Sequence, residues 1–134
     1  MRIYKTRSFN KWVTKEGLID PVLAAAVAEM KAGLIDAELG SQVVKKRGPL
    51  PGRGKRGGAR TLLVYRQSDR AFFVYGFAKN ECDNIDAREL KALKQLTAIQ
   101  LGLSEAQLLH ALHAGTLIEV KHDKSTAQNI APNR

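Results

Sequence analysis

The stretch VVKKRGPLPGRGKRGGARTLLVYR, Val43 to Arg66, joins two apolar segments through a loop rich in glycine and proline. The flanks VVKK and TLLVY are apolar and β-branched, which predicts strands rather than a floppy basic tail. Glycine and proline interrupt GPLPGRGKRGG throughout, so we expect that segment to be neither helix nor strand. The 24 residues hold eight cations and no acid: Lys45, Lys46, Arg47, Arg53, Lys55, Arg56, Arg60 and Arg66. Because like charges repel, this gathering indicates a rigid electropositive site for an anion.

The composition indicates what that anion is. The chain has 134 residues, enough for one domain, and a formal net charge of +9, which favours nucleic acid over an acidic protein or an anionic membrane as partner. The lone Cys82 cannot form an intramolecular disulfide, which fits a reducing compartment. The segment MRIYKTRSFNKW is charged where a signal peptide is apolar, and VLAAAVA is too short to span a bilayer. We therefore expect a cytoplasmic protein with no membrane partner.

The first forty residues predict a short strand followed by two helices. RIY reads as the strand, Ser8 as the N-cap of a first helix, and Gly17 as its end. Asp20 followed by Pro21 is a strong start for a second helix. The apolar face of that helix recurs at helical spacing at Leu23, Val27, Met30 and Leu34. Two short helices joined by a tight turn make an αα-hairpin.

The rest of the chain predicts strands and then helices again. ARTLLVYR and AFFVYGFAK are strong strand patterns joined by the turn QSD. Asp86 with Glu89 and Ser104 with Gln107 mark the starts of two helices, and TLIEV reads as a last strand. The order β-αα-βββ-αα-β predicts an α+β fold with one largely antiparallel sheet. We expect one domain over residues 1–120 and a polar, disordered tail over residues 121–134.

Strand alternation groups the basic and aromatic side chains. Lys45 and Arg47 are expected on one face of their strand, and Arg60, Leu62, Val64 and Arg66 on one face of the next. On the following strand, Phe73, Tyr75, Phe77 and Lys79 are expected on one side, and Phe72, Val74, Gly76 and Ala78 on the other. A face that carries cations and aromatics suits unpaired RNA, because cations neutralise phosphates and Tyr75 or Phe77 can stack on a base, at roughly 1–3 kcal/mol each.

Enzymatic chemistry in this chain must use lysine and arginine. The three histidines and Cys82 do not match zinc-ligand spacing, and no Ser/His/Asp arrangement or catalytic carboxylate pair is evident. We therefore expect no metal and no cofactor. RNA is cleaved when its own 2′-hydroxyl attacks the adjacent phosphorus, and clustered cations stabilise the charge that develops there.

The segments GRGKRGGART, RAFFVYGFAKNE and ELKALKQLTAIQLGLSEAQL together resemble a branch of the RelE/ParE toxin superfamily, the HigB/RelE-like toxins of bacterial toxin–antitoxin operons. The resemblance extends from Met1 to about Val120. It implies a RelE-like fold in which an N-terminal αα-hairpin packs on a small twisted antiparallel sheet, with helices towards the C-terminus. It also implies endoribonuclease activity on mRNA, usually on the ribosome, and a cognate antitoxin as partner.

Carried over by position, the resemblance assigns four catalytic residues: Lys45, Arg47, Arg60 as a ligand of the scissile phosphate, and Lys79. It assigns binding of the RNA backbone or of ribosomal RNA to Arg53, Lys55, Arg56 and Arg66. Well-studied RelE-type toxins carry a tyrosine shortly after the point that matches GFAK, and related toxins a histidine. The segment NECDNID has neither here, so the resemblance assigns no general acid or base.

Three functions remain open at this point. The first is an mRNA interferase, which leaves a cyclic phosphate end and needs no metal. The second is a ParE-like inhibitor of DNA gyrase, which acts by protein contact on the same fold. The third is a non-catalytic RNA-binding or ribosome-associated domain, in which loss of Arg60 and Lys79 weakens binding but alters no reaction rate.

Overall fold

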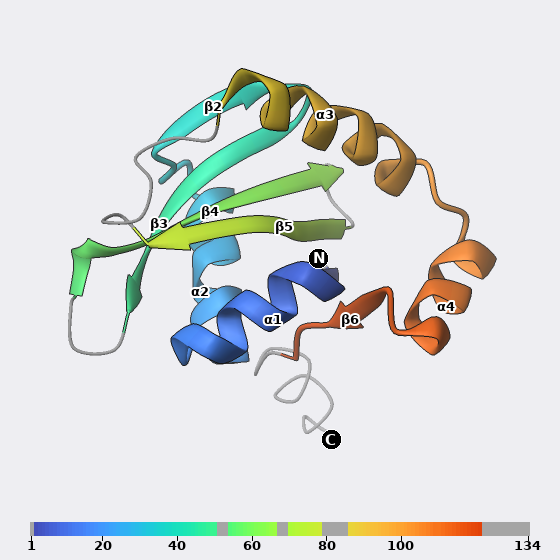
Figure 1. Cartoon of the computed structure of the whole chain (residues 1–134), viewed down its shortest axis with the longest axis horizontal. Helices are drawn as coiled ribbons and strands as arrows, with labels where there is room; N and C mark the ends of the chain where they lie inside the picture. Colours follow the sequence, from blue (N-terminus) through green and yellow to red (C-terminus); the bar gives the residue numbers. More distant parts are fainter. Residues whose placement is uncertain (1, 51–53, 67–69, 79–85, 122–134) are drawn as a thin grey trace.

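The computed structural model describes residues 2–50, 54–66, 70–78 and 86–121 of the chain (Figure 1). In chain order the elements are β1 (Arg2–Thr6), α1 (Arg7–Glu16), α2 (Asp20–Lys31), β2 (Ala37–Gly40), β3 (Val43–Leu50), β4 (Gly54–Arg66), β5 (Arg70–Ala78), α3 (Ala87–Leu101), α4 (Glu105–Ala114) and β6 (Leu117–Glu119). The expected QSD turn and the expected tail, apart from Lys121, lie outside the described residues.

The strands of the described residues form one sheet in the order β2-β3-β4-β5-β1-β6. β1 pairs with β5 in parallel, and the other neighbouring strands are antiparallel. This confirms the α+β class and the largely antiparallel sheet. The sequence pattern did not predict β2, which pairs with the first residues of β3.

The segment GPLPGRGKRGG is strand for most of its length, so the expectation that it is neither helix nor strand is wrong. β3 continues to Leu50 and β4 begins at Gly54, and these two residues pair. The register shifts between Gly48 and Leu50, the interval that contains Pro49. Proline has no N–H to donate to a sheet, and a register irregularity is a position where a strand accepts it.

The αα-hairpin is confirmed, with shifts at the helix starts. Thr6, not Ser8, caps α1, because its side chain accepts a hydrogen bond from the backbone N–H of Phe9 at 3.2 Å. Gly17 ends α1 as expected, with a positive φ of 80° that favours glycine. Leu23, Val27 and Met30 are buried, as their spacing predicts. Leu34 lies beyond the end of α2 and is 61% exposed, so the prediction that it belongs to the apolar face of the helix is wrong.

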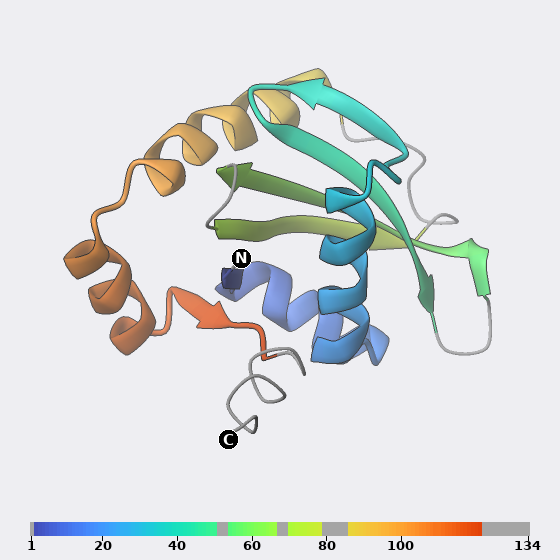
Figure 2. The ribbon, with the colours of Figure 1, turned by 180° about the vertical axis from the view of Figure 1, so that it is seen from behind.

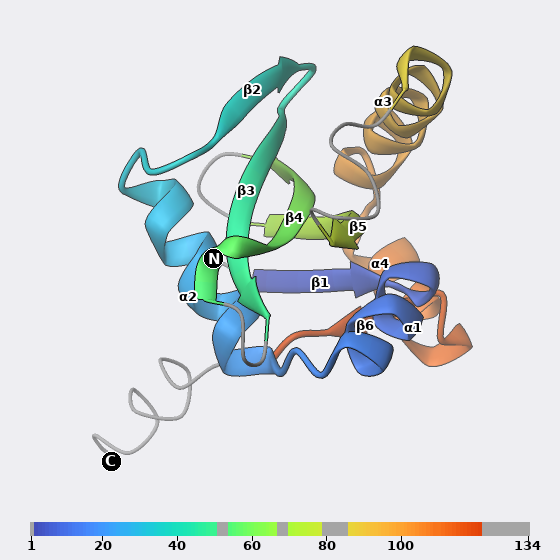
Figure 3. The ribbon, with the colours of Figure 1, turned by 60° about the vertical axis from the view of Figure 1, so that its left-hand side comes forward.

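The hairpin covers one face of the sheet, which we call the hairpin face. Figure 2 shows α2 lying across β3 and β4, and Figure 3 shows α2 and α3 on opposite sides of these strands. The core on the hairpin face consists of Ile3, Phe9, Val13, Leu23, Val27, Met30, Val44, Leu63, Ala71, Phe73 and Val120.

The opposite face, which we call the basic face, has its own apolar cluster at one end. Its buried members are Tyr4, Val43, Leu62, Val64, Phe72, Val74, Leu108 and Leu117. α3 and α4 supply partly buried side chains to this cluster, among them Leu93 and Leu112.

The predicted capping box of Ser104 with Gln107 starts α4, and Gly115 ends it. Within the described part of the chain, no helix has the length and apolar character needed to cross a membrane.

A β-bulge in β5 changes which aromatics share a face. Leu62 pairs with Tyr75 while Leu63 pairs with Phe73, so Val74 is an extra residue in the strand. Phe73 therefore faces the hairpin, and Tyr75 and Phe77 lie on the basic face. The expectation that Phe73, Tyr75 and Phe77 share one side is wrong, because simple alternation does not anticipate the inserted residue.

Candidate functional site

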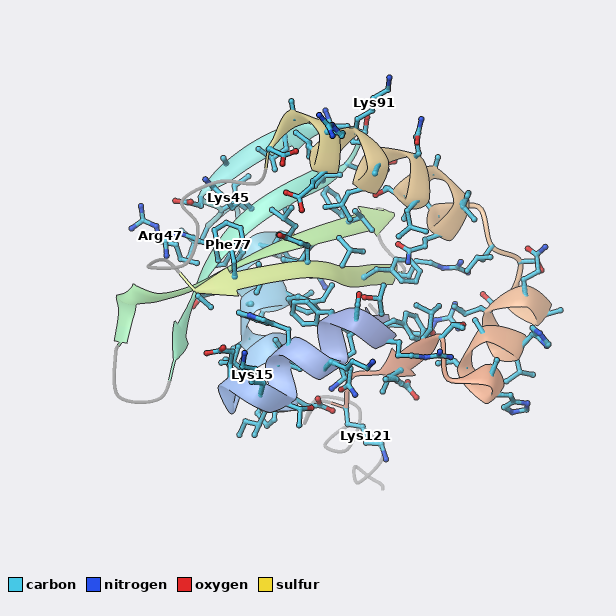
Figure 4. The ribbon with its side chains drawn as sticks, viewed as in Figure 1. Lys15, Lys45, Arg47, Phe77, Lys91 and Lys121 are labelled. Atoms are coloured by element: carbon cyan, nitrogen blue, oxygen red, sulfur yellow. The ribbon has the colours of Figure 1, made fainter. Side chains whose placement is uncertain are left out.

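The two basic strands bring three cations together on the basic face. Arg47 on β3 pairs directly with Arg60 on β4, and Lys45 is two residues from Arg47, on the same side of β3. We call Lys45, Arg47 and Arg60 the cation cluster. Figure 4 shows Lys45 and Arg47 beside Phe77 at one end of the sheet, whereas Lys15 projects from α1 and Lys91 from α3. The sequence predicted this shared face, and the register places the three side chains there.

One carboxylate, from Asp36, lies among these cations. Oδ1 of Asp36 accepts a hydrogen bond from Nε of Arg47 at 2.9 Å. Oδ2 lies 3.6 Å from Nζ of Lys45 and 3.9 Å from Nε of Arg60. The backbone N–H of Asp36 donates to the carbonyl of Lys45 at 2.8 Å, which fixes the residue beside β3. Both carboxylate oxygens therefore face cations.

The charges around Asp36 alter its ionisation. Burial alone would raise the pKa of Asp36, but the hydrogen bond from Arg47 and the charges of Arg47, Lys45 and Arg60 outweigh burial and hold that pKa below its ordinary value. Asp36 is therefore ionised at neutral pH. Among the described residues, Asp36 is the one carboxylate that pairs with Arg47 and Arg60, so it offsets only part of their positive charge.

Arg60 is the most enclosed member of the cluster. Its side chain is 8% exposed, compared with 17% for Lys45 and 48% for Arg47. Among the described residues, its partners are distant: the carbonyl oxygen of the adjacent Ala59 lies 3.5 Å from Nη1, and Asp36 lies 3.9 Å from Nε. A guanidinium carries five N–H donors, and a buried one needs acceptors. Arg60 is thus suited to bind an incoming anion.

The two aromatics on this face differ in exposure. Phe77 pairs with Arg60 across the strands but is 4% exposed, so it offers little ring surface to a base. Tyr75 is partly exposed, and its hydroxyl donates to Oε2 of Glu89, on the first turn of α3, at 3.5 Å. Their ring centroids are 6.0 Å apart. The geometry therefore favours Tyr75 over Phe77 as a stacking platform.

The remaining predicted RNA-binding residues are not all near the cluster. Arg66 pairs with Arg70 at the far end of β4. It is six residues from Arg60, a distance of about 20 Å at the rise of a strand. Lys55 and Arg56 lie on β4 between Gly54 and the cluster. Arg53 and Lys79 lie outside the described residues.

Lys46 belongs to the same basic stretch but lies on the hairpin face. Its side chain is 5% exposed and pairs with Oε1 of Glu29 on α2. Lys5, also on the hairpin face, pairs with Asp20 at 3.1 Å. Each of these lysines has a carboxylate from α2, so they stabilise the packing of the hairpin on the sheet and are not part of the cluster.

A cavity of about 320 Å³ opens on the hairpin face between α2 and β4. Its walls are mainly apolar, and Arg47 is the one cation among its lining residues in the described part of the chain. In the same described ranges, no three His, Cys, Asp or Glu side chains group as metal ligands would. The candidate anion site is therefore the cation cluster on the basic face.

Sequence reasoning missed Asp36. It precedes Lys45 by nine residues and lies between α2 and β2, so its pairing depends on a chain reversal that the residue pattern does not show. The one available signal was an acid shortly after Gly33, between a predicted helix and the basic strand.

Comparison with known protein families gave a match that covers most of the chain. The family model that describes the RelE toxin of the RelE/RelB toxin–antitoxin system matches residues 1–120. The comparison with curated proteins gave no match, and neither did the comparison with solved structures.

Proposed function

The chain belongs to the RelE toxin family, and on that premise we propose that it is an endoribonuclease that cleaves mRNA on the ribosome. Membership makes it the toxin of a toxin–antitoxin system and implies an antitoxin as its partner. The cation cluster is the proposed site of the reaction, with Lys79 as a fourth cation. The proposed place of action is the cytoplasm, where mRNA is translated.

The observation that supports this proposal most is the convergence of Lys45, Arg47 and Arg60 on one position. Cations from two paired strands face the same carboxylate, so their side chains reach the place that a phosphate would take. A carboxylate has two oxygens and a phosphodiester has two non-bridging oxygens, and a guanidinium group binds either pair through paired N–H donors. Tyr75, on the same face, is placed to stack on a neighbouring base.

The proposed reaction needs the RNA, these side chains and water, which carries the protons because no side chain is assigned as general acid or base. The 2′-oxygen forms a bond to phosphorus while the bond from phosphorus to the 5′-oxygen breaks, leaving a 2′,3′-cyclic phosphate and a 5′-hydroxyl. A base takes the proton of the 2′-hydroxyl, and the leaving 5′-oxygen gains a proton. The phosphorane carries one more negative charge than the diester, and the cation cluster stabilises that extra charge.

The test is cleavage of a defined mRNA by the toxin after separation from its antitoxin, with and without ribosomes. We expect fragments with cyclic phosphate ends and, in the reaction without ribosomes, the same rate in the presence of EDTA; the chelation test excludes ribosomes because their assembly needs Mg²⁺. Arg60→Ala should abolish the fragments, while Lys15→Ala, which removes the same charge from exposed α1, should not. Loss of ribosome-free cleavage on chelation, or equal effects of the two substitutions, contradicts the proposal.

A non-catalytic RNA-binding protein is the second candidate. The absence of tyrosine and histidine from the segment NECDNID favours it, because related toxins carry one of them at this point. In that case the separated toxin binds RNA but leaves it intact. If induction of the toxin damages DNA before translation stops, both the endoribonuclease and the RNA-binding proposals are rejected in favour of ParE-like inhibition of gyrase.

A further inference from the structure

Asp36 has an unusual place in the cation cluster. It is the one carboxylate recorded for all three cations in the described residues, and both of its oxygens face them. Its side chain is 16% exposed, so it occupies the interior of the cluster and not its rim. A carboxylate in this position resembles two of the non-bridging oxygens of a phosphate.

We propose that Asp36 occupies the phosphate position of the cation cluster and is a specificity-determining residue, because RNA must displace its carboxylate to bind. This inference rests on the proposed function of the cluster as a site for RNA. A polyanion that places one phosphate accurately between Lys45, Arg47 and Arg60 displaces the carboxylate. A polyanion that only approaches the face meets a site that is already partly neutralised.

Displacement is sterically feasible. Asp36 is not in a helix or strand but in the connection between α2 and β2. Its position is held by the backbone hydrogen bond to Lys45, which does not involve the side chain. Arg47, which makes the closest contact with the carboxylate, is half exposed. The carboxylate can therefore rotate away while the backbone stays paired with β3.

Structural neutralisation alone does not account for this arrangement. On the hairpin face, Lys5 and Lys46 each have a separate carboxylate. On the basic face, among the described residues, Arg47 and Arg60 share the one carboxylate of Asp36, and the nearest atoms of Asp36 and Arg60 are 3.9 Å apart, beyond hydrogen-bonding distance. Asp36 thus lowers the positive charge of the cluster without accepting a hydrogen bond from the guanidinium of Arg60. This is expected if the position is occupied by another anion when ligand binds.

The test compares Asp36→Asn with Glu38→Gln. Both substitutions remove one negative charge, but Glu38 is exposed on β2 and pairs with Val44, whose side chain faces the hairpin. The probe is a short single-stranded RNA with 2′-O-methyl groups, which cannot be cleaved by attack of its own 2′-oxygen. Its affinity is measured by fluorescence anisotropy over a series of salt concentrations, and folding of each variant is checked by thermal unfolding. Asp36→Ser replaces Asp36→Asn if the latter does not fold.

We expect Asp36→Asn to bind the probe roughly 3- to 10-fold more tightly than wild type, with an unchanged salt slope, because RNA makes the same phosphate contacts with the cation cluster once the carboxylate of Asp36 is displaced. Glu38→Gln should bind like wild type. An equal increase in affinity in the two variants would mean that only the net charge of the protein matters. Weaker binding by Asp36→Asn would mean that Asp36 positions the cations. Either result, or no binding by any of these proteins, overturns the inference.

The outcome is separable from that of the proposed function. If wild type leaves unmodified RNA intact but Asp36→Asn still binds the probe more tightly, the endoribonuclease proposal fails and the role of Asp36 stands. If wild type cleaves RNA and Asp36→Asn shows no gain in affinity, the endoribonuclease proposal stands and the role of Asp36 fails.

Discussion

The hairpin face and the basic face of the sheet both carry buried or partly buried cations, and they neutralise them differently. On the hairpin face, Lys5 pairs with Asp20 and Lys46 with Glu29, so each lysine has one carboxylate from α2. On the basic face, within the described part of the chain, cations from β3 and β4 share one carboxylate, that of Asp36. Adjacent residues of one strand, Lys45 and Lys46, thus belong to two different electrostatic environments.

We interpret this difference as a division between charges that stabilise the fold and charges that serve binding. A buried charge with its own partner contributes to packing, and removal of the partner leaves it unsatisfied. A group of like charges destabilises the fold by repulsion, so its retention is consistent with the proposed role in binding. Substitutions on the hairpin face should therefore alter stability, and substitutions on the basic face should alter activity.

The largest expected effect is that of Arg60→Ala on RNA cleavage. Loss of one donor that stabilises developing charge lowers the rate roughly 100- to 1000-fold. Arg60 has only distant partners among the described residues, so the free energy of unfolding should change little. Single-turnover cleavage and urea denaturation of the same preparation measure both quantities. A variant that unfolds easily but cleaves normally would reverse the assignment of the two faces.

The second-largest expected effect is the loss of stability caused by Glu29→Ala. Lys46 is 4% exposed, and without Glu29 its ammonium group loses its recorded carboxylate. Glu29 is itself about one-third exposed, so water reduces the penalty, and we expect a loss of about 1–3 kcal/mol in the free energy of unfolding. Cleavage per folded molecule should stay at the wild-type rate. A drop in cleavage with unchanged stability would show that the hairpin face also takes part in catalysis.

The third effect concerns the packing of α1 against β5 at Gly76. A Cβ added at Gly76 would lie 2.5 Å from Cζ3 of Trp12, so Gly76→Ala must displace the indole on α1, at a cost of about 1–2 kcal/mol in stability. Gly102→Ala is the matched control, since its nearest neighbour would be 3.4 Å away and its φ is −92°. Urea denaturation of the two variants measures the difference. Equal stabilities would mean that Trp12 moves freely, and that the hairpin does not fix the orientation of β5.

Much of this fold was predictable because local patterns encode it. Gly17 and Gly115 end their helices with positive φ, and Ser104 with Gln107 starts α4, each within one turn of chain. The facing of Lys45, Arg47 and Arg60 followed from strand alternation and pairing.

The missed features depend on contacts between distant residues. The inserted Val74 reverses the facing of Tyr75 and Phe77, and an alternating pattern gives no sign of one extra residue. Asp36 and Arg60 are 24 residues apart in the sequence and come together only when β2 and β3 fold beside β4. The basic stretch itself contains no acid, so it gave no sign of this partner. The sequence pattern therefore predicted the cations of the candidate site but not the anion between them.

The smallest expected effect is the pH dependence that Asp36 gives to stability. The charges of Arg47, Lys45 and Arg60 outweigh burial and hold the pKa of Asp36 below its ordinary value of 3.8. The folded chain then binds fewer protons at Asp36 than the unfolded chain does, so the ionised group stabilises the fold above its ordinary pKa, and this contribution is lost as the pH falls through the folded pKa. Relative to Asp36→Asn, wild type should have an advantage of less than about 1 kcal/mol that is constant between about pH 5 and 7 and declines below about pH 4. Urea denaturation of both proteins at pH values across this range measures it. A difference that grows as the pH falls would require a raised pKa, and the carboxylate would then not be held by the three cations.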